Sequence, residues 1–99
     1  TESANTFADG MAVRVPVPAA LDAILAGCER IVRVSDDEVR AAVSHFYSDT
    51  HNLVEGAGAA PLAALMKDRM RTGSRFAVIA SGGNIDRGMY LEALNGGVA

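Results

Sequence analysis

The chain has 99 residues, of which 49% are hydrophobic and 21% are charged. This length allows one small domain, and this composition is that of an ordinary globular protein. The formal net charge is −3, and basic residues are interleaved with acidic ones, so no basic surface for nucleic acid is expected. The single cysteine, Cys28, excludes an internal disulfide, and no apolar run is long enough to span a membrane. We therefore expect a cytoplasmic protein that binds neither nucleic acid nor a membrane.

The first third of the chain predicts a helix followed by a strand. Residues 19–26 place three large aliphatic side chains on one helical face, and Pro18 suits the first turn. Residues 30–34 are short and rich in β-branched side chains, which favours a strand.

Residues 36–50 predict the longest helix. Ser35 and Glu38 have the spacing of a capping box, in which each side chain accepts from the backbone N–H of the other residue. The acidic first turn also suits the positive end of the helix dipole. One apolar stripe follows at helical spacing, formed by Val39, Ala42, Val43, Phe46 and Tyr47.

The second half predicts a helix, a strand and a helix. Pro61 either stands in the first turn of the next helix or lies inside a helix that begins slightly earlier. Its expected buried face consists of Leu62, Leu65, Met66 and Met70. Residues 76–80 are apolar without alternation, which is typical of a strand covered on both faces. Residues 85–94 resume a helical pattern.

The predicted order is helix, strand, helix, helix, strand, helix, and the predicted fold class is α/β. Two strands connected through helices form a parallel pair with a right-handed crossover. Two strands make an incomplete sheet whose edges need partners. We therefore expect this chain to be the edge of a larger sheet, and its start at Thr1 without an initiator Met suggests a piece of a longer protein.

The first candidate site is the turn Ser81-Gly82-Gly83-Asn84. It follows a predicted strand and precedes a predicted helix, where open α/β sheets place their ligands. Two adjacent glycines let the backbone approach a bound group closely. The alternative is a purely structural turn capped by Asn84, and on local grounds the two interpretations are about equal.

The second candidate is Glu55, which stands between an apolar pair and a run of very small residues, 56–60. A carboxylate in such surroundings is expected to be partly removed from water and therefore to need polar partners. That makes it a site candidate. An acidic N-cap for the following helix is the equally good local alternative.

The remaining polar residues indicate no further chemistry. His45 and His51 lack the spacing of paired metal ligands, and no cysteine or carboxylate cluster supports them, so no metal site is expected. No nucleophile–base pair is found, so no catalytic residue is expected in this segment. The only lysine, Lys67, falls on the polar side of its predicted helix and is interpreted as a solvated surface residue.

Four blocks occur in one order along the chain: TFADGMAV from Thr6, RIVRVSDDEV from Arg30, EGAGA from Glu55 and SGGNID from Ser81. Together they resemble the C-terminal part of the threonine/serine dehydratase family, which uses pyridoxal 5'-phosphate (PLP) and has the tryptophan-synthase-β-like fold, fold type II. The resemblance covers nearly the whole chain. It implies that residues 1–99 are the C-terminal segment of the large, cofactor-binding domain, a three-layer fold with a parallel sheet, without a complete second domain.

The resemblance also implies a function and site roles. Members of the family convert L-threonine or L-serine to 2-oxobutyrate or pyruvate and ammonia. Ser81 matches the hydroxyl that hydrogen-bonds the pyridine nitrogen of PLP. A neutral hydroxyl does not hold that nitrogen fully protonated, so the ring is a moderated electron sink. Gly82 and Gly83 would let the turn lie against the ring, Glu55 matches a glutamate near the cofactor, and Asp9–Gly10 resembles an active-site loop.

Other parts of the family's site have no counterpart in these residues. The Schiff-base lysine and the glycine-rich phosphate loop lie earlier in such chains, so the segment alone is expected to be inactive. Serine racemase and hydroxyaspartate ammonia-lyase share the same blocks and remain alternatives, as does a non-catalytic α/β association module. The expected partners are an amino-acid substrate and either another copy of the protein or the missing N-terminal part.

Overall fold

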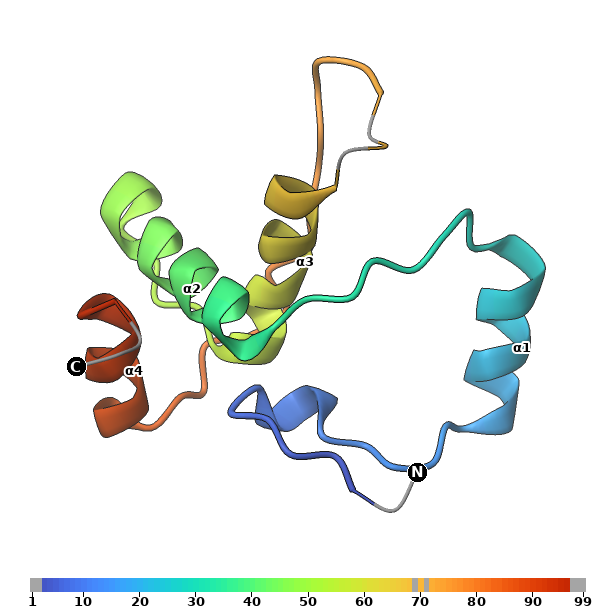
Figure 1. The fold of residues 1–99 in the computed structure, drawn as a ribbon, viewed down its shortest axis with the longest axis horizontal. Coiled ribbons are helices and arrows are strands. Elements are labelled where there is room, and N and C mark those ends of the chain that lie inside the picture. The colour runs from blue at the N-terminus through green and yellow to red at the C-terminus, as the bar shows by residue number, and fades with distance from the viewer. Residues whose placement is uncertain (1–2, 69, 71, 97–99) are drawn as a thin grey trace.

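The computed structural model describes residues 3–68, 70 and 72–96. In these residues the chain forms one short 3-10 helix and four α-helices (Figure 1). They are η1 (Asp9–Met11), α1 (Pro18–Gly27), α2 (Asp36–Thr50), α3 (Gly56–Lys67) and α4 (Arg87–Leu94). The helices predicted at residues 19–26, 36–50 and 85–94 are confirmed to within one helical turn at each end.

α2 begins with the capping box that its sequence predicts. The backbone N–H of Glu38 donates to Oγ of Ser35 at 3.1 Å, and the backbone N–H of Ser35 donates to Oε1 of Glu38 at 2.7 Å. Lys67, at the end of α3, donates from Nζ to the same carboxylate oxygen at 3.0 Å. The hydrogen bond from the Ser35 backbone and then that from Lys67 hold the pKa of Glu38 below its ordinary value. The cap thus joins the start of α2 to the end of α3.

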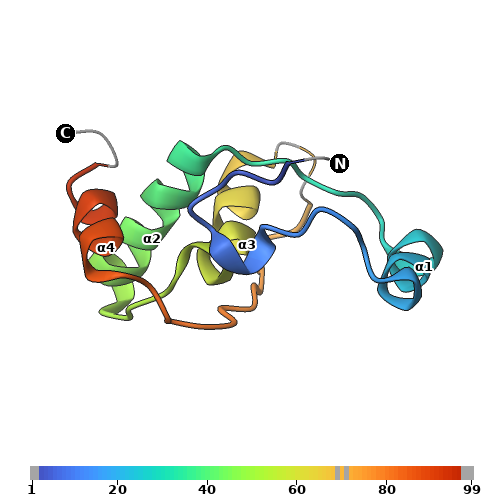
Figure 2. The ribbon, with the colours of Figure 1, turned by 90° about the horizontal axis from the view of Figure 1, so that it is seen from below.

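The core lies where α2 packs against α3 and α4 (Figures 1 and 2). α2 contributes an apolar face, and α3 contributes a face of very small residues. The buried cluster consists of Val39, Ala42, Val43, Val54, Ala59, Ala60, Ala63 and Ala93. Among the described residues, Val43 is the largest side chain that is fully buried. The core is therefore shallow and built on close helix contact, with little apolar volume per residue.

α3 begins at Gly56, so Pro61 lies inside the helix, which is the second of the two predicted arrangements. The predicted buried face is wrong in part. Leu62 packs partly against the core, but Met66 is 51% exposed and Met70 lies beyond the end of the helix. The helix turns Ala59, Ala60 and Ala63 toward the core that it shares with α2, because a face without long side chains allows the closer approach.

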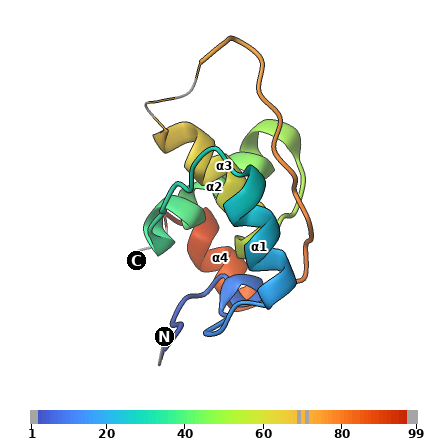
Figure 3. The same cartoon turned by 90° about the vertical axis from the view of Figure 1, so that its right-hand side faces the viewer.

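The two segments predicted as strands, residues 30–34 and 76–80, are neither helix nor strand in this structure. A strand exists only where a neighbouring strand shares its ladder of hydrogen bonds, and residues 3–68, 70 and 72–96 contain no such pair. Ile31 is 74% exposed and Ile79 is 75% exposed, so the second segment is not covered on both faces here. Figure 3 shows residues 72–86 as one long connection along the side of the molecule.

Polar contacts hold residues 30–34 beside the C-terminal end of α3. Nη2 of Arg30 pairs with Asp68, and Nζ of Lys67 donates to the carbonyl oxygen of Arg33 at 2.8 Å. The hydrogen bond with Asp68 is the main reason why the pKa of Arg30 is raised above its ordinary value. The Arg30–Asp68 ion pair and the hydrogen bond from Lys67 therefore hold this segment, whereas a strand would be held by a ladder of backbone hydrogen bonds.

α1 packs against none of the other described helices (Figures 1 and 2). None of its residues is buried, and Leu25 is 74% exposed. The apolar side chains that precede and follow Leu25 are exposed as well: Met11, Val13, Val15, Val17, Leu21, Ile24 and Ile31. Within the described part of the chain, no helix combines the length and apolarity needed to cross a bilayer.

The lowered pKa of Glu38 predicts a pH-dependent contribution to stability. Because the folded-state pKa lies below the unfolded value, the charge of Glu38 stabilises the fold at neutral pH, and this contribution is lost as the pH falls through the folded-state value. Gln at this position can keep the capping hydrogen bond but neither titrates nor pairs with Lys67. We expect Glu38→Gln to be less stable than the parent at neutral pH, with a deficit that shrinks as the pH falls through the folded-state pKa of Glu38, in urea unfolding followed across pH.

The matched control is Asp22→Asn, which removes an exposed carboxylate from α1. Its stability, measured over the same pH range, is the reference for the loss of one exposed carboxylate. A stability deficit of Glu38→Gln that stays constant across the acidic range would contradict the prediction.

Candidate functional site

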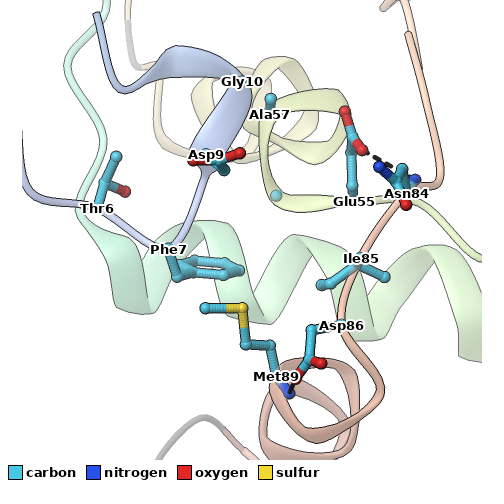
Figure 4. Close-up of a pocket in the computed structure, with 11 residues that line it drawn as sticks. Thr6, Phe7, Asp9, Gly10, Glu55, Ala57, Asn84, Ile85, Asp86 and Met89 are labelled. Carbon is cyan, nitrogen blue, oxygen red and sulfur yellow. Dashed lines mark hydrogen bonds between the residues drawn. The ribbon is translucent and has the colours of Figure 1, made fainter.

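A hollow of about 600 Å³ lies where three segments that are distant in sequence meet (Figure 4). The segments are the N-terminal stretch up to η1, the start of α3, and the turn that leads into α4. The hollow is lined by Thr6, Phe7, Asp9, Gly10, Glu55, Gly56, Ala57, Asn84, Ile85, Asp86 and Met89. Three of the four sequence blocks that carry the family resemblance therefore meet at one place.

Contacts with α2 and α3 fix the N-terminal stretch beside this hollow. The hydroxyl of Thr6 donates to the carboxylate of Asp36 in the first turn of α2. Cζ of Arg40 lies 4.7 Å from the centroid of the Phe7 ring, a cation–π contact. On the other side, Gly56 allows close approach, because a Cβ there would lie 3.0 Å from Cε2 of Phe7. Our sequence analysis missed these contacts, which join residues far apart in the chain and leave no local pattern.

Glu55 is joined to the glycine turn by two hydrogen bonds. Its backbone N–H donates to the carbonyl oxygen of Gly82 at 3.0 Å, and its Oε2 accepts from the backbone N–H of Asn84 at 2.8 Å (Figure 4). The side chain is half-buried, as a carboxylate between apolar and very small residues was expected to be. The structure thus brings Glu55, Gly82 and Gly83 together.

Both local alternatives for these residues invoked a helix cap: the N-cap position of Glu55 is confirmed, and the cap of α4 by Asn84 is wrong. Glu55 stands at the N-cap position of α3, but its side chain makes no capping hydrogen bond. α4 is capped by Asp86 in place of Asn84, since Oδ2 of Asp86 accepts from the N–H groups of Gly88 and Met89 at 3.1 and 3.3 Å. An Asp immediately before a helical run is a common N-cap signal, so this cap was accessible from the sequence.

Ser81 opens onto a second hollow of about 400 Å³. Its other lining residues are apolar or glycine: Gly10, Met11, Val32, Val34, Ala57, Ala60, Pro61 and Ala64. Gly10 and Ala57 line both hollows, which are therefore adjacent. Ser81 is the one residue with a side-chain hydroxyl among those that line this hollow, while Glu55 lines the neighbouring hollow.

The glycine turn lies tightly against residues 53–58. A Cβ on Gly83 would lie 2.8 Å from the carbonyl oxygen of Leu53, and a Cβ on Gly58 would lie 2.9 Å from that of Gly82. Real Cβ atoms do not approach backbone oxygens so closely, so both positions require glycine. Close backbone contact was the property expected of this turn, although here its partner is the start of α3.

Three carboxylates from three different segments line the larger hollow, which lies beside a helix N-terminus. Asp9, Glu55 and Asp86 contribute carboxylates, and the first residues of α3 place the positive end of the helix dipole nearby. The carboxylates of Glu55 and Asp86 already accept backbone N–H groups. In the described ranges, no three His, Cys, Asp or Glu side chains are arranged to hold a metal ion.

Comparison with known proteins identifies the family. The family described as pyridoxal-phosphate dependent enzymes matches residues 1–82. L-threonine ammonia-lyase of Thermotoga maritima is 31% identical over 97 residues, which are 98% of this chain and 24% of that protein. L-threonine ammonia-lyase of Geobacter sulfurreducens is 42% identical over 82 residues, which are 82% of this chain and 20% of that protein. Serine racemase of Dictyostelium discoideum is 28% identical over 94 residues, which are 92% of this chain and 29% of that protein. No solved structure matches the chain.

The chain belongs to the family of pyridoxal-phosphate dependent enzymes. The L-threonine ammonia-lyases among its relatives confirm the resemblance to the threonine dehydratase family of fold type II, an α/β class. The cofactor that this family implies is PLP. The chain spans between 20% and 29% of the length of the three relatives given above.

The described residues fit one side of a PLP ring. The second hollow is lined by apolar side chains against which a flat aromatic ring can pack, and by Ser81, the one lining residue that carries a hydroxyl. Lys67 lines neither hollow, and its Nζ donates to Glu38 and to the backbone of Arg33. Its side chain is 46% exposed, which confirms its interpretation as a surface residue.

The packing of the glycine turn against α3 predicts the effect of Gly58→Ala. Alanine normally stabilises a helix interior relative to glycine by about 1 kcal/mol. Here the added Cβ would meet the carbonyl oxygen of Gly82 at 2.9 Å, and overpacking of this kind costs about 1–3 kcal/mol. We expect net destabilisation, measured by chemical unfolding. The control is Gly27→Ala at the end of α1, where a Cβ meets nothing within 4 Å. Equal effects of the two substitutions would show that the turn does not pack as described.

Proposed function

We propose that this chain forms one wall of the cofactor site in a PLP-dependent dehydratase that converts L-threonine or L-serine to 2-oxobutyrate or pyruvate and ammonia. The observation that carries the proposal is that Ser81, the first residue of the turn 81–84, lines a hollow whose other lining residues are apolar or glycine. The relatives named as L-threonine ammonia-lyases support the choice of reaction.

The proposed role of Ser81 follows from the chemistry of a hydroxyl. When bound, PLP supplies the electron sink that elimination from an amino acid requires. The hydroxyl of Ser81 would donate to the pyridine nitrogen without protonating it, since a serine hydroxyl has no tendency to give up its proton at neutral pH. A ring held in this way withdraws electrons moderately, which favours prompt loss of a β-hydroxyl over accumulation of a long-lived carbanion.

The surrounding residues would orient the ring and exclude water. Val32, Val34 and Ala60 present apolar atoms in the same hollow as Ser81. An apolar lining strengthens the hydrogen bond to the ring nitrogen because water does not compete for it. Gly82 and Gly83 keep the turn free of side chains, so that the backbone beside Ser81 can approach the ring, and the Asp9–Gly10 loop would border the site where the two hollows adjoin.

Under the proposal, the catalytic lysine lies in a part of the protein outside these 99 residues. Lys67 is the only lysine of the chain and is held by Glu38 and the Arg33 carbonyl, away from both hollows. The 99-residue chain by itself is therefore expected to be inactive. The exposed apolar surface around α1 and at residues 76–80 supports contact with further parts of the same protein or with a second copy.

Serine racemase is the second candidate function, because a protein of that name is similar over 92% of this chain. The same wall with Ser81 would serve it, and the two activities differ in whether the β-hydroxyl leaves or a proton returns to the α-carbon. Hydroxyaspartate ammonia-lyase activity and a non-catalytic association role are further alternatives, which the experiment below separates by product and by cofactor content.

The test uses the full gene product that carries this chain. We expect it to show the visible absorbance of bound PLP and to release 2-oxobutyrate from L-threonine, and the 99-residue chain alone to show neither. Ser81→Ala should slow turnover at least about tenfold, equivalent to about 1.4 kcal/mol, and alter the cofactor spectrum without changing the unfolding transition. The control is Ser48→Ala, which removes an exposed hydroxyl from α2.

Each other result has a definite meaning. D-serine formed from L-serine in preference to pyruvate would favour the racemase, and ammonia released from 3-hydroxyaspartate alone would favour that lyase. A colourless and inert full-length protein would refute the proposal. Unchanged turnover and spectrum in Ser81→Ala would remove Ser81 from the cofactor site.

A further inference from the structure

We propose that Glu55 is a positioning residue that fixes the Ser81–Asn84 turn through two hydrogen bonds, and so determines where the Ser81 hydroxyl stands, without itself touching the cofactor. The inference rests on the proposed function for the role of Ser81, but the contact between Glu55 and the turn is independent of it. It refines the expectation from the family resemblance, which placed Glu55 near the cofactor without a defined contact.

The two hydrogen bonds attach to the turn on both sides of Gly83. The backbone N–H of Glu55 donates to the carbonyl oxygen of Gly82 at 3.0 Å, and its carboxylate Oε2 accepts from the backbone N–H of Asn84 at 2.8 Å. One residue at the start of α3 therefore holds both flanks of Gly83, and Figure 4 shows the bond between Glu55 and Asn84. These bonds fix the two peptide units on either side of Gly83. The backbone nitrogen of Gly82, which belongs to the peptide that follows Ser81, packs against Gly58, where a Cβ would lie 3.2 Å from it.

The turn needs such an attachment because it lies outside regular secondary structure. Residues 81–86 are neither helix nor strand, and two of them are glycines, which lose more conformational freedom on ordering than other residues. Within the turn, the N–H of Ile85 donates to the carbonyl oxygen of Gly83 at 3.2 Å, a local contact that does not tie the turn to the helices. The bonds to Glu55 tie it to α3, which belongs to the buried core.

The direction of the Glu55 side chain argues for positioning over cofactor contact. Its carboxylate lines the larger hollow, whereas Ser81 lines the adjacent apolar one. Oε1 faces Gly82 and Gly10, whose Cβ atoms, if present, would lie 3.0 and 3.9 Å away. The carboxylate thus fills the space between these two glycine backbones. To hold the turn, the side chain at position 55 must be long enough to place a hydrogen-bond acceptor at the Asn84 amide. It does not need to carry a negative charge.

This distinction makes Glu55→Gln the informative variant. Gln keeps an acceptor oxygen at the same position and loses the charge, whereas Glu55→Ala loses the acceptor. Two readouts are taken in the full gene product: hydrogen exchange of the Asn84 backbone amide without cofactor, and the dissociation constant and visible spectrum with PLP added. The matched control is Glu92→Ala, which removes a carboxylate on α4 that is 54% exposed and lies outside both hollows.

We expect Glu55→Ala to speed exchange at Asn84 by about tenfold or more and to weaken PLP binding by a similar factor, the size of one lost hydrogen bond to a charged group. Glu55→Gln should stay within about threefold of the parent in both readouts, since a neutral acceptor bonds somewhat more weakly than a carboxylate. Glu92→Ala should match the parent.

Three results would overturn the proposal. Unchanged exchange at Asn84 in Glu55→Ala would show that Glu55 does not hold the turn. Equal loss of PLP affinity in Glu55→Gln and Glu55→Ala, with Asn84 still protected in Glu55→Gln, would show that the charge acts on the cofactor. If Asn84 exchanges faster in Glu55→Ala but the spectrum and the affinity of PLP are unchanged, the turn does not position Ser81 relative to the cofactor ring.

Two further outcomes are read separately. If Glu55→Ala does not fold, Gly82→Ala replaces it, because its Cβ would lie 3.0 Å from Oε1 and displace the carboxylate. Faster Asn84 exchange is then expected, and unchanged exchange overturns the proposal. If the parent protein does not bind PLP, the proposed function fails, while exchange at Asn84 in the same variants still decides whether Glu55 holds the turn.

Discussion

The run of very small residues from 56 to 60 is the constraint on which the rest of the structure depends. Because Gly58 has no side chain, the backbone of Gly82 lies directly against the first turn of α3, and because Gly56 has none, the N-terminal stretch packs on the same turn. Ala59 and Ala60 are buried in the cluster that α2 shares with α3. One helical turn therefore provides both the core contact and the surface on which the two hollows form.

The two segments predicted as strands show that secondary structure, too, depends on which segments lie next to one another. Residues 30–34 and 76–80 have compositions that favour strands, yet in the described residues they make no ladder and leave Ile31 and Ile79 exposed. A strand is a property of at least two segments, because its hydrogen bonds leave the segment that forms it. The α/β class of the family accounts for such sequences, and their exposure supports the proposal that further protein covers them.

Ser81 and Glu55 have different surroundings in the structure, although the family resemblance placed both of them near the cofactor. Both were expected beside the cofactor, and the structure places them on adjoining hollows that share Gly10 and Ala57. Ser81 offers a hydroxyl to an apolar surface, whereas the hydrogen bonds of Glu55 go to the turn that carries Ser81. A hydrogen-bond donor for an aromatic nitrogen must be placed accurately, and a two-glycine turn alone does not provide that accuracy.

The sequence by itself determined the elements whose causes are local. The capping box of α2 joins residues three apart, its apolar stripe follows from helical spacing, and the glycine turn and Glu55 stood out as candidates by composition alone. The buried face of α3 and the hydrogen bond of Glu55 to a backbone amide 29 residues away came from the tertiary packing alone. Burial and long-range hydrogen bonds depend on which segments meet, and a segment's own sequence does not specify its neighbours.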